Sequence, residues 1–352
     1  MDQKEMQRRM EEMRARMREI NREFGGANHE AIAIYEDCTM YDIPQLAELV
    51  LLERKVMGAK SKEERLAIIA EFKDKLSKVK KIPNAPERIL LWPEGKMPKL
   101  TEYTENTDNQ YFHDPDFQPY MLEVLVPENV QPVGAVITVA GGQHGPNTLN
   151  ECYQINREFN ALGYQGFILH CRPNACPWDP RETGADVARA VRLIRANAAK
   201  YRIDPDRIAL AGFSNGGIAG DSCIRFYSGD QTVKDSFPDY EPDELDKIPG
   251  CMDVFLCVYG ARHKGTEPSN PRVVYPACFF ACGLEDKAGV VNLYSLLPEL
   301  IEHNVRLELH TFAGQPHGYA GWKILEGNGN PTFDYLVQLA DVFMQDTYKN
   351  YR

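Results

Sequence analysis

The sequence has little of three things that would place it in a special class: basic charge, long apolar runs and patterned cysteines. Its 40 Lys and Arg residues are outnumbered by 51 Asp and Glu, which gives a formal net charge of −11. Nucleic-acid backbones are bound by clustered Lys and Arg, so a polyanion is excluded as the main ligand. The longest apolar stretches, 250–260 and 275–283, are far shorter than the ~20 residues of a membrane span. We therefore expect neither a nucleic acid nor a membrane as a partner.

The nine cysteines show no recognisable spacing. They are odd in number and scattered, without a C-x-x-C motif or a Cys/His cluster at zinc spacing, which is typical of reduced, buried thiols. Neither a disulfide framework nor a metal site is predicted. Residues 1–20 are charged throughout and lack the apolar core of a secretory signal. The expected location is the cytoplasm.

The N-terminal part, residues 1–98, is predicted to be a helical extension. Apolar residues recur at spacings of three and four from Met6 to Phe24, so they lie on one stripe of a helix. This stripe predicts packing on the rest of the chain, a cover over an active site, or a dimerising arm. A homo-oligomer formed through these helices is therefore one expectation.

Two more helices are predicted in this extension. One covers 43–58, and the next opens at Ser61, where Glu64 three residues later completes a capping-box pattern. Four prolines between 82 and 98 then end the helical pattern. We place the domain boundary there, with the second domain at 99–352.

From about residue 99 the pattern changes to short apolar strands that alternate with helices. Strands of this kind, separated by crossover helices, favour an α/β fold with a mostly parallel sheet and helices on both faces. Ligand sites in such sheets lie at the carboxyl ends of the strands. The expected strands are 120–127, 134–141, 165–170, 207–212, 253–260, 275–283 and 305–314.

Ser214 occupies a G-x-S-x-G pattern between a predicted strand and a predicted helix. A sharp strand-to-helix turn would strain the serine backbone and leave no room for side chains beside it, which explains Gly212 and Gly216. The pattern predicts an exposed nucleophilic hydroxyl at a helix N-terminus. The alternative is a glycine-rich turn without chemistry.

A serine hydroxyl is a poor nucleophile unless a histidine accepts its proton and an acid orients that histidine. Of the eight histidines, His317 lies in a glycine-rich loop directly after the last predicted strand. Asp286 lies in the loop after the preceding strand and is the candidate acid. Its neighbour Glu285 is the main rival, and Asp253 is a weaker one because it opens a strand.

Acyl transfer also needs N–H groups that bind the developing oxyanion. The first candidate donor is Asn215, the residue after the serine. The second is Gly142 or Gln143, in the glycine-rich loop after the strand at 134–141, where a plain turn is the alternative. Rings in loops near the predicted site are candidates for contacting a substrate, although packing explains them equally well. These residues are His144, Trp178, Tyr319 and Trp322.

Together these features resemble the α/β-hydrolase superfamily over residues 115–345. Within it, they are most similar to the small carboxylesterases related to acetyl xylan esterases and to the hormone-sensitive-lipase-like group. Residues 137–145 resemble the family's H/P-G-G-G loop, and 185–217 resemble its helix, strand and nucleophile turn. The chain departs from the family at Ala140, where His or Pro is usual, and at Gln143, where a third Gly is common.

The resemblance implies a serine carboxylesterase that hydrolyses short-chain acyl esters, above all acetyl esters, on sugars derived from plant polysaccharides. It implies a Ser-His-Asp triad, an acyl-enzyme and no metal or organic cofactor. Two alternatives stay open. A small serine peptidase of the prolyl-oligopeptidase type shares the triad order but normally carries a β-propeller, and a binding protein on a hydrolase scaffold would have no activity.

Overall fold

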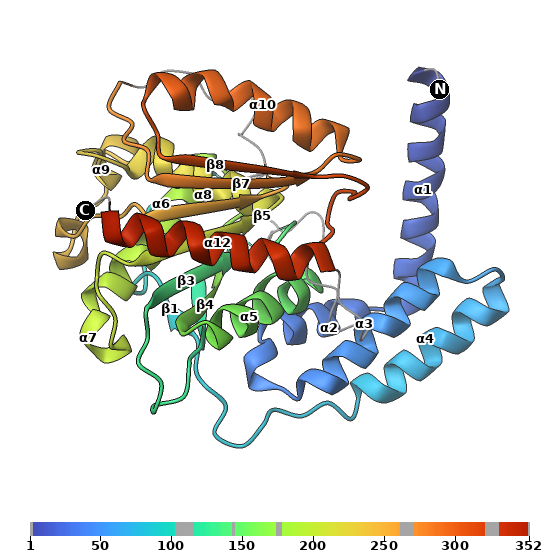
Figure 1. Ribbon diagram of the computed structural model, residues 1–352. Helices are drawn as coiled ribbons and strands as arrows, with labels where there is room; N and C mark the ends of the chain where they lie inside the picture. Colours follow the sequence, from blue (N-terminus) through green and yellow to red (C-terminus); the bar gives the residue numbers. More distant parts are fainter. Residues whose placement is uncertain are drawn as a thin grey trace. The chain divides into compact units, whose positions relative to one another are not determined.

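A computed structural model of the chain describes residues 3–102, 114, 116–142, 145–173, 178–260, 271–320 and 331–350 (Figure 1). Contacts within the chain divide it into two compact units, Met1–Ala85 and Pro86–Arg352. The division comes earlier than the boundary expected after residue 98. The physical reason is that β1 (Ile89–Leu90) pairs with β2 (Tyr120–Val124), so the chain after Ala85 already joins the sheet of the second unit.

Helices build the first unit, as predicted. Ser61 is confirmed as the N-cap of the last of them, because its Oγ accepts a hydrogen bond from the Glu64 N–H at 3.1 Å. The Glu64 carboxylate accepts from the N–H of Lys60 rather than from that of Ser61, one residue away from the ideal capping box. The described α-helices of this unit are α1 (Gln3–Phe24), α2 (Ala27–Glu36), α3 (Ile43–Gly58) and α4 (Lys62–Leu76), with a 3₁₀ turn, η1 (Cys38–Met40).

The apolar stripe of α1 packs within the first unit at its C-terminal end. Ile20 and Phe24 are buried, and the Phe24 ring meets Phe72 of α4 edge-on, with 5.1 Å between the ring centroids. Met17, one turn earlier, is 37% exposed. Packing on the same chain is thus confirmed for Ile20 and Phe24, while oligomerisation and a covering role stay predictions.

An eight-stranded sheet forms the centre of the second unit, in the order β1-β2-β4-β3-β5-β6-β7-β8. The strands from β3 onward run parallel, while β2 pairs antiparallel with both β1 and β4. The predicted, mostly parallel sheet is confirmed, and β1 is an addition to it. The parallel strands are β3 (Gly134–Val139), β4 (Tyr164–His170), β5 (Ile208–Phe213), β6 (Val254–Val258), β7 (Ala277–Gly283) and β8 (Leu307–Phe312).

Helices cover both faces of this sheet (Figure 1). On one face, Val187, Val191 and Ile194 of α6 are fully buried. Leu336 and Phe343 of α12 bury the other face. The first face carries α6 (Pro180–Ala196), α8 (Asn215–Tyr227) and α10 (Lys287–Glu302), and the second carries α5 (Ile155–Ala161) and α12 (Pro331–Asn350).

Short helical segments complete the described part of this unit: η3 (Thr148–Gln154), α7 (Ala198–Tyr201), α9 (Val233–Ser236) and η4 (Glu244–Lys247). η3 has π-helical geometry and runs directly into α5. Gly163 follows with a φ of 93°, the left-handed conformation expected where the helix ends. Within the described residues, no helix is long and apolar enough to cross a membrane.

A buried ion-pair cluster supports the loop after β4. The Arg172 guanidinium is fully buried and donates to the Asp186 carboxylate at 2.7 and 2.9 Å. Asp186 also accepts from the indole N–H of Trp92 at 2.8 Å, and Glu182 lies 3.7 Å from the guanidinium. Removing one partner would leave a buried charge uncompensated, at a cost of about 3–5 kcal/mol.

Candidate active site

Ser214 forms the turn between β5 and α8. Its backbone has φ 51° and ψ −114°, a strained conformation for a residue with a side chain. Its N–H donates to the carbonyl of Val258 at 3.0 Å, and its own carbonyl accepts from the N–H of Gly217 at 2.9 Å. The serine is therefore held from both sides at the N-terminus of α8, where the motif predicted it.

The two glycines beside the serine are required by close backbone contacts. A β-carbon on Gly212 would lie 2.4 Å from the carbonyl oxygen of Gly216, and one on Gly216 would lie 2.0 Å from the carbonyl oxygen of Val139. Both obstacles are backbone atoms, which cannot swing away as a flexible side chain would. The turn thus leaves no room for side chains, as predicted.

Replacing Gly216 with alanine is therefore expected to lower the free energy of unfolding by at least about 1–3 kcal/mol, the usual cost of overpacking. Urea denaturation followed by circular dichroism measures this change. Gly58→Ala is the control, because a β-carbon there meets nothing within 4 Å and alanine is the better helix former. Wild-type stability of Gly216→Ala would contradict the close contact with Val139.

The structure brings the three predicted side chains into one hydrogen-bonded chain. His317 Nε2 lies 2.9 Å from Ser214 Oγ, and His317 Nδ1 lies 2.6 Å from Asp286 Oδ2. The three residues follow β5, β7 and β8, at the carboxyl ends of the strands. The imidazole is half-exposed while the carboxylate is buried. This geometry allows the imidazole to accept the serine proton while the carboxylate orients the ring.

Asp286 makes two separate contacts with its two carboxylate oxygens. Oδ2 faces His317, and Oδ1 accepts from the N–H of Gly289 at 2.9 Å as the N-cap of α10. The neighbouring rival, Glu285, is exposed. Asp253 directly precedes β6, at the opposite strand end, and pairs with Arg195 at 2.9 Å. Among the three acids, the structure places Asp286 at the histidine.

The candidate oxyanion donors lie on two neighbouring strand ends. Gly142 follows β3 with a φ of 67°, and Asn215 is the first residue of α8 after β5. β3 and β5 pair directly, with Val139 opposite Gly212, so the two loops start side by side. Gln143, the other candidate in the first loop, is outside the described residues. The donor roles stay predictions.

Two of the four rings predicted to contact substrate are packed in the interior. Tyr319 is 2% exposed, and its ring centroid lies 5.2 Å from that of Tyr259. Trp178 is 3% exposed and lies against Arg172, with 5.8 Å between the guanidinium carbon and the ring centroid. Packing, the alternative offered for these rings, accounts for both. His144 and Trp322 are outside the described residues.

Comparison with known proteins identifies the fold of this chain. Residues 122–230 match the BD-FAE family model, a stretch of less than half of the chain. A solved acetyl ester-xyloside bifunctional hydrolase from Caldicellulosiruptor lactoaceticus is similar with a TM-score of 0.51 and 20% identity, over 74% of this chain and 96% of that one. An alpha/beta hydrolase enzyme from a Medee basin deep-sea metagenome library has a TM-score of 0.50 and 20% identity, over 66% and 93%. The chain has an α/β-hydrolase fold.

A curated relative adds a sequence match to this α/β-hydrolase fold. Endo-1,4-beta-xylanase B of Butyrivibrio fibrisolvens is 26% identical over 261 residues, which is 64% of this chain. The match spans only 40% of the relative's own length. The relative's activity as a whole is therefore not transferred to this chain.

The candidate site also contains a buried carboxylate, Glu151, that the sequence patterns did not predict. Glu151 lies in η3 and is 6% exposed. Its Oε2 accepts from the N–H of Gly141, and its Oε1 accepts from the hydroxyl of Tyr259 at 2.7 Å. Burial raises the pKa of Glu151 to about 7, although both hydrogen bonds and the nearby His317 oppose this rise. Glu151 precedes Ile155 by four residues and so shares the apolar face of a helix with it. A carboxylate on an apolar helix face is the sequence signal that could have predicted a buried acid here.

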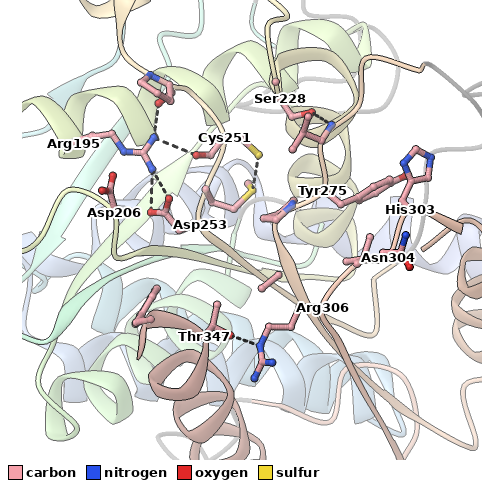
Figure 2. A pocket seen from close by; sticks show the side chains of 18 residues that line it. Arg195, Asp206, Ser228, Cys251, Asp253, Tyr275, His303, Asn304, Arg306 and Thr347 are labelled. Carbon is pink, nitrogen blue, oxygen red and sulfur yellow. Dashed lines mark hydrogen bonds and ion pairs between the residues drawn. The ribbon is translucent and has the colours of Figure 1, made fainter. Parts of the chain in front are cut away.

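A cleft of about 590 Å³ lies at the amino ends of β6, β7 and β8, the strand ends opposite to the candidate site; Figure 2 shows the residues that line it. Its cations are paired within the chain. The Arg195 guanidinium points to Asp253 at 2.9 Å, and Arg306 donates to Thr347 Oγ1 at 2.9 Å (Figure 2). These pairs favour a structural role for the residues that line the cleft.

Proposed function

We propose that the protein is a serine carboxylesterase that removes short acyl groups, above all acetyl, from sugars derived from plant polysaccharides. The observation that carries the proposal is the chain of hydrogen bonds from Ser214 Oγ through His317 to Asp286, at 2.9 and 2.6 Å. The match to a xylanase supports xylan-derived esters as the first substrates to test.

In the acylation step, Ser214 Oγ attacks the ester carbonyl carbon while His317 Nε2 accepts the hydroxyl proton. Asp286 Oδ2 accepts the hydrogen bond of His317 Nδ1–H, which keeps the correct tautomer and stabilises the imidazolium. The N–H groups of Asn215 and of Gly142 or Gln143 would bind the oxyanion of the tetrahedral intermediate. As the intermediate collapses, the C–O bond to the alcohol breaks and His317 returns the proton to the leaving oxygen.

Deacylation repeats these steps with water as the nucleophile. His317 accepts a proton from water, the hydroxide attacks the acyl carbon, and the bond to Ser214 Oγ breaks with return of the proton to the serine. The products are the free acid and the free alcohol. Every proton transfer uses the His317 imidazole, so the mechanism needs no second general acid or base.

The substrate class is tested with p-nitrophenyl acetate, butyrate and octanoate, an acetylated xylo-oligosaccharide and a p-nitroanilide of a short peptide. We expect the highest kcat/KM for the acetyl ester, a decline with chain length, release of acetate from the oligosaccharide and no turnover of the anilide. Turnover of the anilide in preference to the esters would favour a peptidase. An absence of turnover of all five would contradict the proposal.

A further inference from the structure

Gly141, at the start of the loop after β3, is held at both of its backbone polar groups. Its N–H donates to Glu151 Oε2, and its carbonyl oxygen accepts from Asn147 Nδ2 at 2.8 Å. Asn147 is the N-cap residue of η3, and Glu151 follows four residues later, so the two side chains lie one turn apart on the same helix side. We call this pair of contacts the Gly141 clamp.

Glycine is needed at position 141 for the clamp to close. A β-carbon there would lie 2.7 Å from Glu151 Oε2. The carboxylate thus occupies the space that a side chain would fill, and it reaches the backbone N–H directly. The loop and the helix face are fitted to each other at this point.

The clamp determines the direction of the next N–H in the chain. The peptide unit is planar and trans, so the carbonyl of Gly141 and the N–H of Gly142 point in opposite directions from one rigid plane. Asn147 holds the carbonyl, and the direction of the Gly142 N–H follows from it. This N–H is one of the two candidates for the second oxyanion donor, the other being that of Gln143, and an oxyanion donor works only when its direction is set before the reaction.

The second oxygen of Glu151 reaches the other side of the site. It accepts from the Tyr259 hydroxyl at 2.7 Å, and the Tyr259 ring lies 5.0 Å from the His317 ring between centroids. Tyr259 directly follows β6 and has a φ of 36°, a conformation that needs support from its surroundings. The Glu151 carboxylate therefore links the loop after β3 to Tyr259, which packs against His317.

We propose that Glu151 and Asn147 are positioning residues for ester hydrolysis: they orient the Gly141–Gly142 peptide for the oxyanion, and Glu151 also holds Tyr259 against His317. The proposal rests on the proposed function. Stability alone gives no reason for a buried carboxylate here, since burying a charge is costly and an apolar side chain of the same size often serves a fold equally well.

Three variants separate the contacts of the clamp. Glu151→Leu keeps the approximate volume and removes the acceptor, and Asn147→Ala removes the donor at a half-buried position. Glu151→Gln is the conservative variant, because its amide oxygen can accept from Gly141 and its NH₂ can donate to the Tyr259 oxygen. Glu158→Gln is the matched control. Glu158 lies two turns further along the same helical stretch and accepts from Gln154 at 2.6 Å.

The measurements are kcat and KM for p-nitrophenyl acetate, the melting temperature, and the Ki of a trifluoromethyl ketone, which forms a tetrahedral adduct with the serine. We expect Glu151→Leu and Asn147→Ala to lower kcat by about 10²-fold, the effect of a misplacement of about 1 Å, with KM unchanged. The Ki should rise by the same factor as kcat/KM falls, because the clamp acts on the tetrahedral state. Glu151→Gln should restore most of the activity, and Glu158→Gln should match the wild type.

Two results would contradict the proposed role of the Gly141 clamp in ester hydrolysis. One is a folded Asn147→Ala with wild-type kcat and Ki, which decides the question even if Glu151→Leu does not fold. The other is a loss that appears in KM and melting temperature while kcat and Ki stay unchanged, since that is the signature of a structural role. Ser214→Ala separates the two proposals: if it is as active as the wild type, the esterase mechanism itself fails, and if it is inactive while clamp variants keep full kcat, only the clamp fails.

Discussion

Ser214→Ala is expected to lower kcat for p-nitrophenyl acetate by about 10⁶-fold, the usual effect of removing a triad nucleophile. The substitution deletes the oxygen that lies 2.9 Å from His317 Nε2. Alanine has a β-carbon like serine, so the backbone strain at φ 51° is nearly the same in both and the turn is expected to survive. The residual rate over water would come from the oxyanion donors and substrate binding.

The measurement is steady-state hydrolysis with active-site titration, and circular dichroism checks the fold. Ser222→Ala is the matched control: Ser222 lies in α8, the helix that begins directly after Ser214, and its hydroxyl donates to the carbonyl of Ile218 at 2.9 Å. We expect that variant to keep wild-type kcat. A rate for Ser214→Ala above about a hundredth of the wild-type rate would be far higher than the residual rate expected after loss of a nucleophile. Such a result would mean that the serine is not the nucleophile.

Asp286→Asn is expected to lower kcat by about 10⁴-fold through loss of the correct imidazole tautomer. The amide presents an NH₂ group to His317 Nδ1 in place of an acceptor, so the imidazole would carry its proton on Nε2 and could not accept one from the serine. The fold should change little. Asparagine caps helices as well as aspartate does, and its oxygen can keep the bond from the Gly289 N–H.

This variant therefore separates the two functions of one carboxylate. The comparison is kcat against melting temperature, with Glu285→Gln as the neighbouring control, since Glu285 is exposed. Parallel losses of kcat and thermal stability would mean that Asp286 acts through α10 rather than through the imidazole. A larger loss of kcat in Glu285→Gln than in Asp286→Asn would make Glu285 the acid.

The nucleophile turn could be predicted from local pattern alone. When a strand, a sharp turn and a helix follow one another within about a dozen residues, only glycine fits where other backbone segments come close. Gly216, which lies against the backbone of Val139, shows this restriction. The strands could be found for the same reason, because continuous burial on both faces leaves short apolar runs. The N-cap at Ser61 is another case in which the deciding contact lies within four residues.

The contacts between distant segments needed the tertiary structure. Glu285 and Asp286 are adjacent, and the sequence offered both as the acid; the start of α10 buries Asp286 and leaves Glu285 exposed. Trp178 and Tyr319 are rings that suit either a ligand or a core, and burial shows that they pack. β1 is too short to be recognised and exists through its pairing with β2.

By itself, then, the sequence determined the fold class and the serine turn, because both depend on short-range periodicity and on steric limits of the backbone. The tertiary structure decided which acid faces His317 across 31 residues and which carboxylate, Glu151, contacts Tyr259 across 108. Ala140 has no polar side chain to brace the loop after β3, and only the folded chain reveals that Asn147 and Glu151 bind the backbone of the neighbouring Gly141. Hydrogen bonds of this kind form where the packing of the sheet and helices brings distant segments together, and no local pattern records them.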